Sequence, residues 1–150
     1  MITITVPGVP IPKARPRFGR GRTYTPQSTV DYESAVRVAW LASDGGKAFG
    51  PVSLELWFVF PCPAHDERKR NPARARWHEK SVDLDNCAKA VADALNGYAY
   101  HDDRQVVTLT ARKLVAPQGE PPRTVVMVRS TDSSAELAYA ALKNAEAMFG

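Results

Sequence analysis

The chain has 150 residues, 44% of them hydrophobic and 24% charged, a composition typical of one globular domain and unlike that of disordered proteins. Two cysteines, Cys62 and Cys87, are too few for a disulfide framework or a thiolate zinc site. No apolar run approaches the roughly 18 residues of a membrane span, and the N-terminus MITITVPG lacks the layout of a signal peptide. We therefore expect a single cytoplasmic domain.

The first part of the chain predicts a strand, a helix and a second strand. Ile2, Ile4 and Val6 alternate with threonines, as in a half-buried strand, and prolines follow them. Thr25-Pro26 is typical of a helix start, and apolar residues then recur at helical spacing, which predicts a helix over about 26–43. The run VSLELWFVF at 52–60 is rich in strand-forming residues.

The second part predicts a helix, two strands and a final helix. An apolar stripe from Leu84 to Leu95 predicts a helix over 84–96. Segments 105–115 and 123–130 are expected to form a hairpin across the turn APQGEPP, and 135–149 is an amphipathic helix. This order predicts one α+β domain over residues 1–150, with a mixed or antiparallel sheet, helices on one face, and a C-terminal helical extension from about 131.

The positive charge is unevenly distributed, because eleven of the twenty Lys and Arg residues lie in two segments. Both segments contain Pro or Gly and are expected to be loops. Either segment alone is equally well explained as solvated surface, but together with the acidic cluster below they favour a polyanionic partner. The residues are Lys13, Arg15, Arg17, Arg20 and Arg22 in the first segment and Arg68, Lys69, Arg70, Arg74, Arg76 and Lys80 in the second.

Four aspartates lie near the two ends of the helix predicted over 84–96: Asp83 and Asp85 at its start, and Asp102 and Asp103 after it. Helix capping explains one of the first pair, and turn chemistry explains the second pair. Asp85, Lys89 and Asp93 recur every four residues, as in an exposed ladder of ion pairs. The alternative is a Mg²⁺ site, in which the fold returns Asp103 to the first pair, because Mg²⁺ prefers oxygen ligands and polarises phosphodiesters.

The pattern D-L-D-N-x-x-K-A-x-x-D-A-L at 83–95, followed by D-D-x-Q-V at 102–106, resembles the RusA family of Holliday-junction resolvases. The segment PIPKARPRFGRGRTYTP at 10–26 also resembles the start of that family's phage and prophage branch. The chain departs from the family in a slightly shorter linker before the second aspartate pair and in its long C-terminal segment from about 131.

The resemblance implies a small homodimeric, Mg²⁺-dependent endonuclease that cuts four-way or other branched DNA by paired nicks in recombination and repair. It implies metal-binding carboxylates at Asp83, Asp85 and Asp103, a catalytic lysine at Lys89, and Asp102 beside the site. The candidate DNA contacts are Lys13, Arg15, Arg17, Arg68, Lys69, Arg70, Arg74 and Arg76.

Two other interpretations remain open from the residues. In one, the chain binds branched DNA without cutting it, and the aspartates are only caps and ion pairs. In the other, it is a different carboxylate-metal nuclease or a phosphatase. Mg²⁺-dependent cutting of a four-way junction, compared with linear DNA, RNA and small phosphoesters, separates the three.

Overall fold

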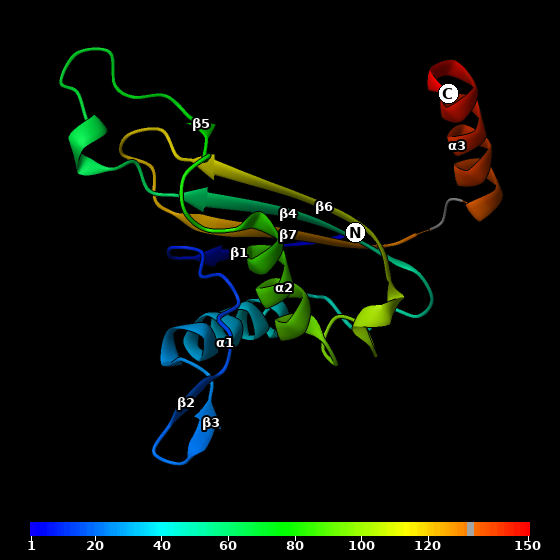
Figure 1. Cartoon of the computed structure of the whole chain (residues 1–150), viewed down its shortest axis with the longest axis horizontal. Coiled ribbons are helices and arrows are strands. Elements are labelled where there is room, and N and C mark those ends of the chain that lie inside the picture. Colours follow the sequence, from blue (N-terminus) through cyan, green and yellow to red (C-terminus); the bar gives the residue numbers. More distant parts are fainter. Residues whose placement is uncertain (132–133) are drawn as a thin grey trace.

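The computed structural model describes residues 1–131 and 134–150, and its centre is a five-stranded mixed sheet (Figure 1). The strand order is β1-β7-β4-β6-β5. Strands β4 and β6 pair in parallel and every other neighbouring pair is antiparallel, which confirms the predicted mixed sheet. The hairpin predicted from segments 105–115 and 123–130 was wrong, because β4 lies between these two strands and pairs with both. The strands are β1 (Ile2–Pro7), β4 (Val52–Phe60), β5 (Arg76–Trp77), β6 (Val106–Val115) and β7 (Arg123–Ser130).

Two helices cover one face of this sheet, α1 (Gln27–Leu41) and α2 (Leu84–Leu95) (Figure 1). Both lie close to their predicted ranges. The core forms between them and the sheet, where the alternate residues Leu54, Leu56 and Phe58 of β4 are fully buried. Strand β4 is the central strand, paired with β7 on one edge and β6 on the other, and seven of its nine residues are buried.

Helix α2 lies in the connection between the parallel strands β4 and β6. A helix in such a connection runs back along the sheet, so its first turn lies near the carboxyl ends of the two strands. In open sheets with parallel strands, this end is where ligands bind. The fold therefore places the start of α2 where a functional site is expected.

The first basic segment is not only a loop, as the sequence predicted, but contains a hairpin of β2 (Arg17–Gly19) and β3 (Arg22–Tyr24). The prediction was wrong here because these strands are short and charged and have no apolar alternation. Arg20 and Gly21 both have positive φ, as in the tight turns that favour hairpins. The second basic segment is mainly irregular, with a short helix η1 (Ala64–Asp66) and the two residues of β5.

Helix α3 (Ala135–Phe149) forms where the sequence predicts it but does not pack on the sheet. All its residues are exposed, and it lies apart from the helices that cover the core (Figure 1). The prediction that helices pack on one face of the sheet therefore holds for α1 and α2 but not for α3. Within the described ranges, no helix combines the length and the apolar character needed to cross a membrane.

Candidate active site

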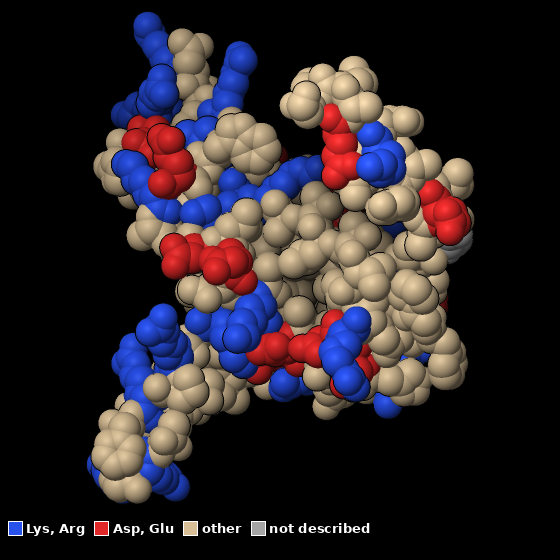
Figure 2. Space-filling view, turned by 45° about the vertical axis from the view of Figure 1, so that its right-hand side comes forward, with Lys and Arg blue, Asp and Glu red and all other residues tan. Residues whose placement is uncertain are grey.

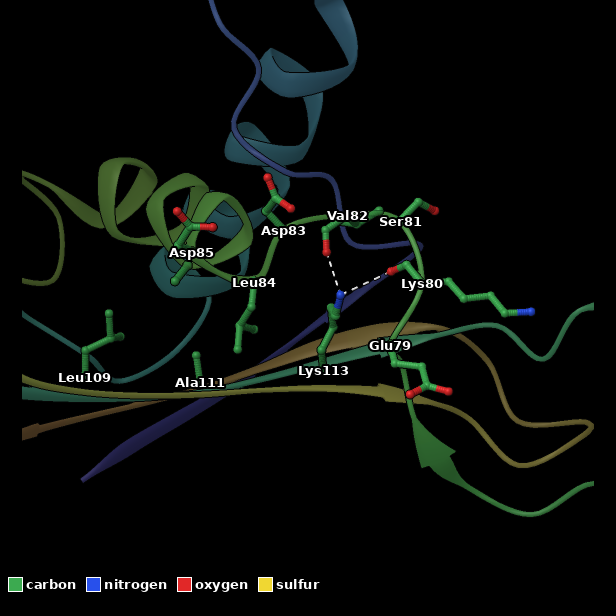
Figure 3. A pocket seen from close by; sticks show the side chains of 11 residues that line it. Glu79, Lys80, Ser81, Val82, Asp83, Leu84, Asp85, Leu109, Ala111 and Lys113 are labelled. Atoms are coloured by element: carbon green, nitrogen blue, oxygen red, sulfur yellow. Dashed lines mark hydrogen bonds between the residues drawn. The ribbon is translucent and has the colours of Figure 1, made fainter.

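A cavity of about 680 Å³ lies between the start of α2, the segment before it and strand β6 (Figure 3). Its polar residues carry charges of both signs, and apolar residues of α2 and β6 form the rest of its wall. It adjoins the carboxyl-terminal half of β6, as expected from the position of α2. The charged lining residues are Glu79, Lys80, Asp83, Asp85 and Lys113.

Asp83 is the residue that precedes α2, yet its side chain does not cap the helix. Its backbone carbonyl accepts a hydrogen bond from the amide of Cys87 at 3.1 Å, and its carboxylate has one long contact, 3.5 Å, with Asn86 Nδ2. Asp83 and Asp85 are both exposed at the cavity (Figure 3). Capping therefore does not account for Asp83, and both carboxylates are available to a ligand.

The predicted ion-pair ladder along α2 does not account for Asp85 and Lys89. Among the described residues, Lys89 has no carboxylate within 4.0 Å, and Asp93 is paired with Lys13 instead, at 3.3 Å. Lys89 is exposed and does not line the cavity. Lys89 lies one helical turn after Asp85 on α2, so its ammonium is on the same side of the helix as the Asp85 carboxylate.

Asp102 and Asp103 have different environments. Asp102 caps the short helix η2 (Asp103–Gln105), and its carboxylate accepts hydrogen bonds from the backbone amide and the guanidinium of Arg104 at 2.9 and 3.1 Å. These bonds lower the pKa of Asp102 below its ordinary value. Asp103 has no ion pair among the described residues, although its carboxylate lies near that of Asp102 and near the charge of Arg104, so turn chemistry explains Asp102 more fully than Asp103.

Asp103 does not line the cavity that Asp83 and Asp85 share. It lies near Tyr100, whose pKa is raised by burial first and then by the charges of Asp103 and Asp93. The Tyr100 hydroxyl donates to the carbonyl of Ala92 at 2.6 Å, toward the end of α2. Within the described residues, no group of three or more His, Cys, Asp or Glu side chains is placed to hold one metal ion. The structure thus brings together two of the three predicted carboxylates.

The donors at the cavity are nevertheless the kind that Mg²⁺ uses. Asp83 and Asp85 supply carboxylate oxygens, and Mg²⁺ usually binds proteins through one or two carboxylates while keeping several waters. The nearby thiol of Cys87 is fully buried, and this burial raises its pKa to about 11 although the charge of Lys113 opposes the shift. At neutral pH the thiol stays protonated, so the available donors are oxygens.

Lys113 is a site residue that the sequence analysis missed. It extends from β6 into the cavity, and its Nζ donates to the carbonyl oxygens of Val82 at 2.6 Å and Lys80 at 3.3 Å (Figure 3). The alternation of β6 contains the signal that could have identified it, because Leu109 and Ala111 share its side of the strand and line the same cavity. A lysine in this register points at the helix side of the sheet, where apolar residues are usual.

The lysine holds a strained segment in place. Val82 has φ of 95°, a left-handed conformation that β-branched residues rarely adopt. The strain sits at the residue before Asp83, and the bond from Lys113 to the Val82 carbonyl opposes relaxation of this peptide. The Lys113 side chain therefore fixes the backbone from which Asp83 extends.

The candidate DNA contacts fall into two groups. The exposed residues Arg15, Arg17, Arg68, Lys69, Arg70 and Arg74 have no ion pair among the described residues. Arg76 is paired with Asp66, and Lys13 Nζ contacts Glu33 Oε1 at 2.6 Å as well as Asp93. Although burial alone would lower the pKa of Lys13, these carboxylates raise it above its ordinary value. Figure 2 shows Lys and Arg gathered on two projections at the left of the view, with acidic side chains between them.

Replacing Lys113 with methionine should loosen the segment before α2. The side chain keeps its length but loses both hydrogen bonds, so we expect faster tryptic cleavage after Lys80 and a loss of about 1–2 kcal/mol in the free energy of unfolding. Lys69→Met, at an exposed lysine in the basic loop, is the matched control and should change neither quantity. Unchanged cleavage after Lys80 in Lys113→Met would show that the hydrogen bonds do not hold this segment.

Comparison with known proteins assigns this chain to a family. The sequence model described as "Endodeoxyribonuclease RusA" matches residues 7–129, which include the cavity, both basic segments and all strands except β1, of which only Pro7 is matched, and the last residue of β7. An uncharacterized protein, YqaN of Bacillus subtilis (strain 168), is 31% identical over 142 residues, covering 88% of this chain and 98% of that protein. The chain belongs to the RusA family of endodeoxyribonucleases.

Proposed function

We propose that this chain is a Mg²⁺-dependent endonuclease that resolves Holliday junctions by paired symmetric nicks, in DNA recombination and repair. The observation that carries the proposal is the pair Asp83 and Asp85, which share one cavity although neither is used as a cap or in an ion pair among the described residues. Family membership supports cutting of DNA, and the cationic projections beside the acids support a polyanionic substrate.

In this proposal, Asp83 and Asp85 hold the metal ion and Asp103 is the third carboxylate. A bound Mg²⁺ would polarise the scissile phosphodiester. Lys89 would contact the phosphate and offset negative charge that develops during cleavage. Lys113 acts on Asp83 through the Val82 peptide. Asp103 is included because, unlike Asp102, its carboxylate has no ion pair among the described residues.

The basic segments would bind the DNA backbone on either side of the acids. The six exposed residues without ion pairs, Arg15, Arg17, Arg68, Lys69, Arg70 and Arg74, are the main candidates. Lys13 and Arg76 also belong to the proposal, but each would have to exchange a carboxylate for a phosphate. Their share of the binding free energy should therefore be smaller.

The function is tested by separating cleavage from binding. Without metal, Asp83 and Asp103 repel DNA phosphates, so Asp83→Asn and Asp103→Asn should bind a four-way junction as well as the wild type or more tightly. Cleavage in Mg²⁺ should fall at least about a hundredfold, since each ~1.4 kcal/mol of lost stabilisation is a factor of ten. Lys89→Ala should lose cleavage too, with equal or slightly weaker binding because a cation is removed.

Asp44→Asn, which removes an exposed acid from the segment between α1 and β4, is the charge-matched control, and thermal melting checks folding. Near-normal junction cutting by Asp83→Asn and Asp103→Asn would refute the metal site. Binding without cutting by the wild type would favour a non-catalytic junction-binding protein. Faster cutting of linear DNA, RNA or small phosphoesters would favour another metal-dependent hydrolase.

The basic loop is tested by the salt dependence of binding. Each cation that neutralises a phosphate adds about 0.9 to the slope of log K against log salt. Replacing Arg68, Lys69 and Arg70 together with alanine should flatten this slope and weaken binding to all DNA sequences alike. If the triple variant keeps the wild-type slope, the loop is solvated surface.

We further propose a twofold homodimer, because paired symmetric nicks in a junction of near-twofold symmetry require two equivalent sites. The apolar stripe of α2 is buried in the core and cannot form the contact. Helix α3 offers an apolar surface, with Leu142 half exposed and Phe149 86% exposed. The charged residues of α3 are Glu136, Lys143 and Glu146, so the helix does not attract DNA. In a twofold dimer, the apolar surface of α3 would instead pack against the same helix of a second copy of the chain.

Pairing through α3 predicts that Leu142→Glu separates the dimer. Light scattering on the wild type at micromolar concentration should give twice 16.5 kDa, and on Leu142→Glu the monomer mass. Asn144→Glu adds the same charge on the opposite side of the helix and should stay dimeric. A dimeric Leu142→Glu would place the contact elsewhere, and a fully active wild-type monomer would refute the dimer.

A further inference from the structure

The β2–β3 hairpin stands apart from the rest of the fold. It forms its own two-stranded sheet and pairs with no strand of the main sheet. Figure 1 shows it projecting below α1, and in Figure 2 its surface is rich in Lys and Arg. Nearly all its residues are exposed. An isolated ribbon of this size contributes little to a core, so its exposed side chains call for another explanation.

Phe18 is the unusual residue on this ribbon, because 77% of its side chain is exposed. It pairs with Thr23 across the ribbon, so these two residues share one face, while Arg17 and Tyr24 are paired on the other. The Tyr24 ring lies against Gly19, where an added Cβ would come within 3.1 Å of it. Phe18 stacks on no other aromatic ring of the described residues and is free to take a flat partner.

The hairpin is tied to the helix that carries the acidic site. The amide of Lys13, just before the ribbon, donates to the carbonyl of Asn86 in the first turn of α2 at 2.9 Å. Its ammonium bridges Glu33 of α1 and Asp93 of α2. On the other side, β3 ends at Tyr24 and α1 begins at Gln27. The segments on both sides of the ribbon are therefore joined to the two helices, one of which carries Asp85.

The chemistry of the ribbon identifies its occupant as DNA with an exposed base face. Arg17, Arg20 and Arg22 provide guanidinium groups that attract phosphates, and the phenyl ring beside them suits the flat apolar face of a base. In a linear duplex these faces are covered by stacking, whereas a branch point interrupts the stack. Apolar side chains that enter such steps keep bases unstacked.

We propose that Phe18 stacks on a base left unstacked at a DNA branch point, and that the β2–β3 hairpin thereby selects branched over linear DNA. The arginines of the ribbon bind the flanking phosphates without distinguishing the two forms. This inference rests on the proposed function, because it takes branched DNA as the substrate and assigns a role in its selection to a residue outside the acidic cavity.

The test compares the affinity of each variant for a four-way junction and for a linear duplex of the same sequence, in EDTA so that no cleavage occurs. Phe18→Ala should weaken junction binding about tenfold, as for the loss of one stacked base, and leave duplex binding unchanged. Phe18→Tyr and Phe18→Trp keep a ring and should retain the preference, whereas Phe18→Leu should lose most of it. Thr23→Ala, on the same face of the ribbon, should behave as the wild type.

The salt dependence of DNA binding shows whether the hairpin keeps its phosphate contacts, and therefore its fold, after the substitution of Phe18. Phe18→Ala should keep the wild-type slope of log K against log salt, whereas Arg20→Ala should lower it by about 0.9 on both DNAs. Three results would overturn the role of Phe18 without overturning the proposed function. These are an equal loss of affinity for junction and duplex in Phe18→Ala, an unchanged junction preference in Phe18→Ala, and a Phe18→Leu variant as selective as the wild type. A wild type without any junction preference would overturn the proposed function with it.

Discussion

Packing of α2 against the sheet is the constraint on which the candidate site depends. Cys87, Val91 and Leu95 are fully buried on one side of this helix, and each aliphatic side chain removed from water contributes roughly 1.5–3 kcal/mol. With 3.6 residues per turn, burial of this stripe leaves Asp85 and Lys89 on the exposed side. The hydrophobic face therefore determines where the charged face points.

Two lysines far apart in sequence then fix the start of this helix. Lys113 reaches it from β6 and binds the Val82 carbonyl, while the backbone of Lys13 binds the Asn86 carbonyl from the opposite segment. Both use the backbone of α2 or of the residues before it, so neither neutralises Asp83 or Asp85 by a direct ion pair among the described residues. These hydrogen bonds therefore position the start of α2 without neutralising the two carboxylates.

The elements predicted correctly are those in which burial follows a simple period. Helix α2 and strand β4 each combine a long apolar pattern with a core position, so local sequence and tertiary packing agree. The β2–β3 hairpin was missed because its stability comes from turn geometry at Arg20 and Gly21, which leaves no apolar pattern. Helix α3 was predicted from its amphipathic pattern, but periodicity does not reveal what the apolar side contacts.

The candidate site shows the same limit at the level of single residues. An aspartate before a helix has one sequence pattern whether it caps the helix or not, and only the structure shows that Asp83 does not cap while Asp102 does. Lys113 was not identified from the sequence because its carbonyl partners depend on the path of residues 80–82, where Val82 is strained. A relaxed Val82 would turn the peptide away from Lys113, so the strained conformation and the hydrogen bond depend on each other. The hydrogen bond from Lys113 stabilises the strained backbone of Val82, and this backbone sets the direction in which the next residue, Asp83, extends.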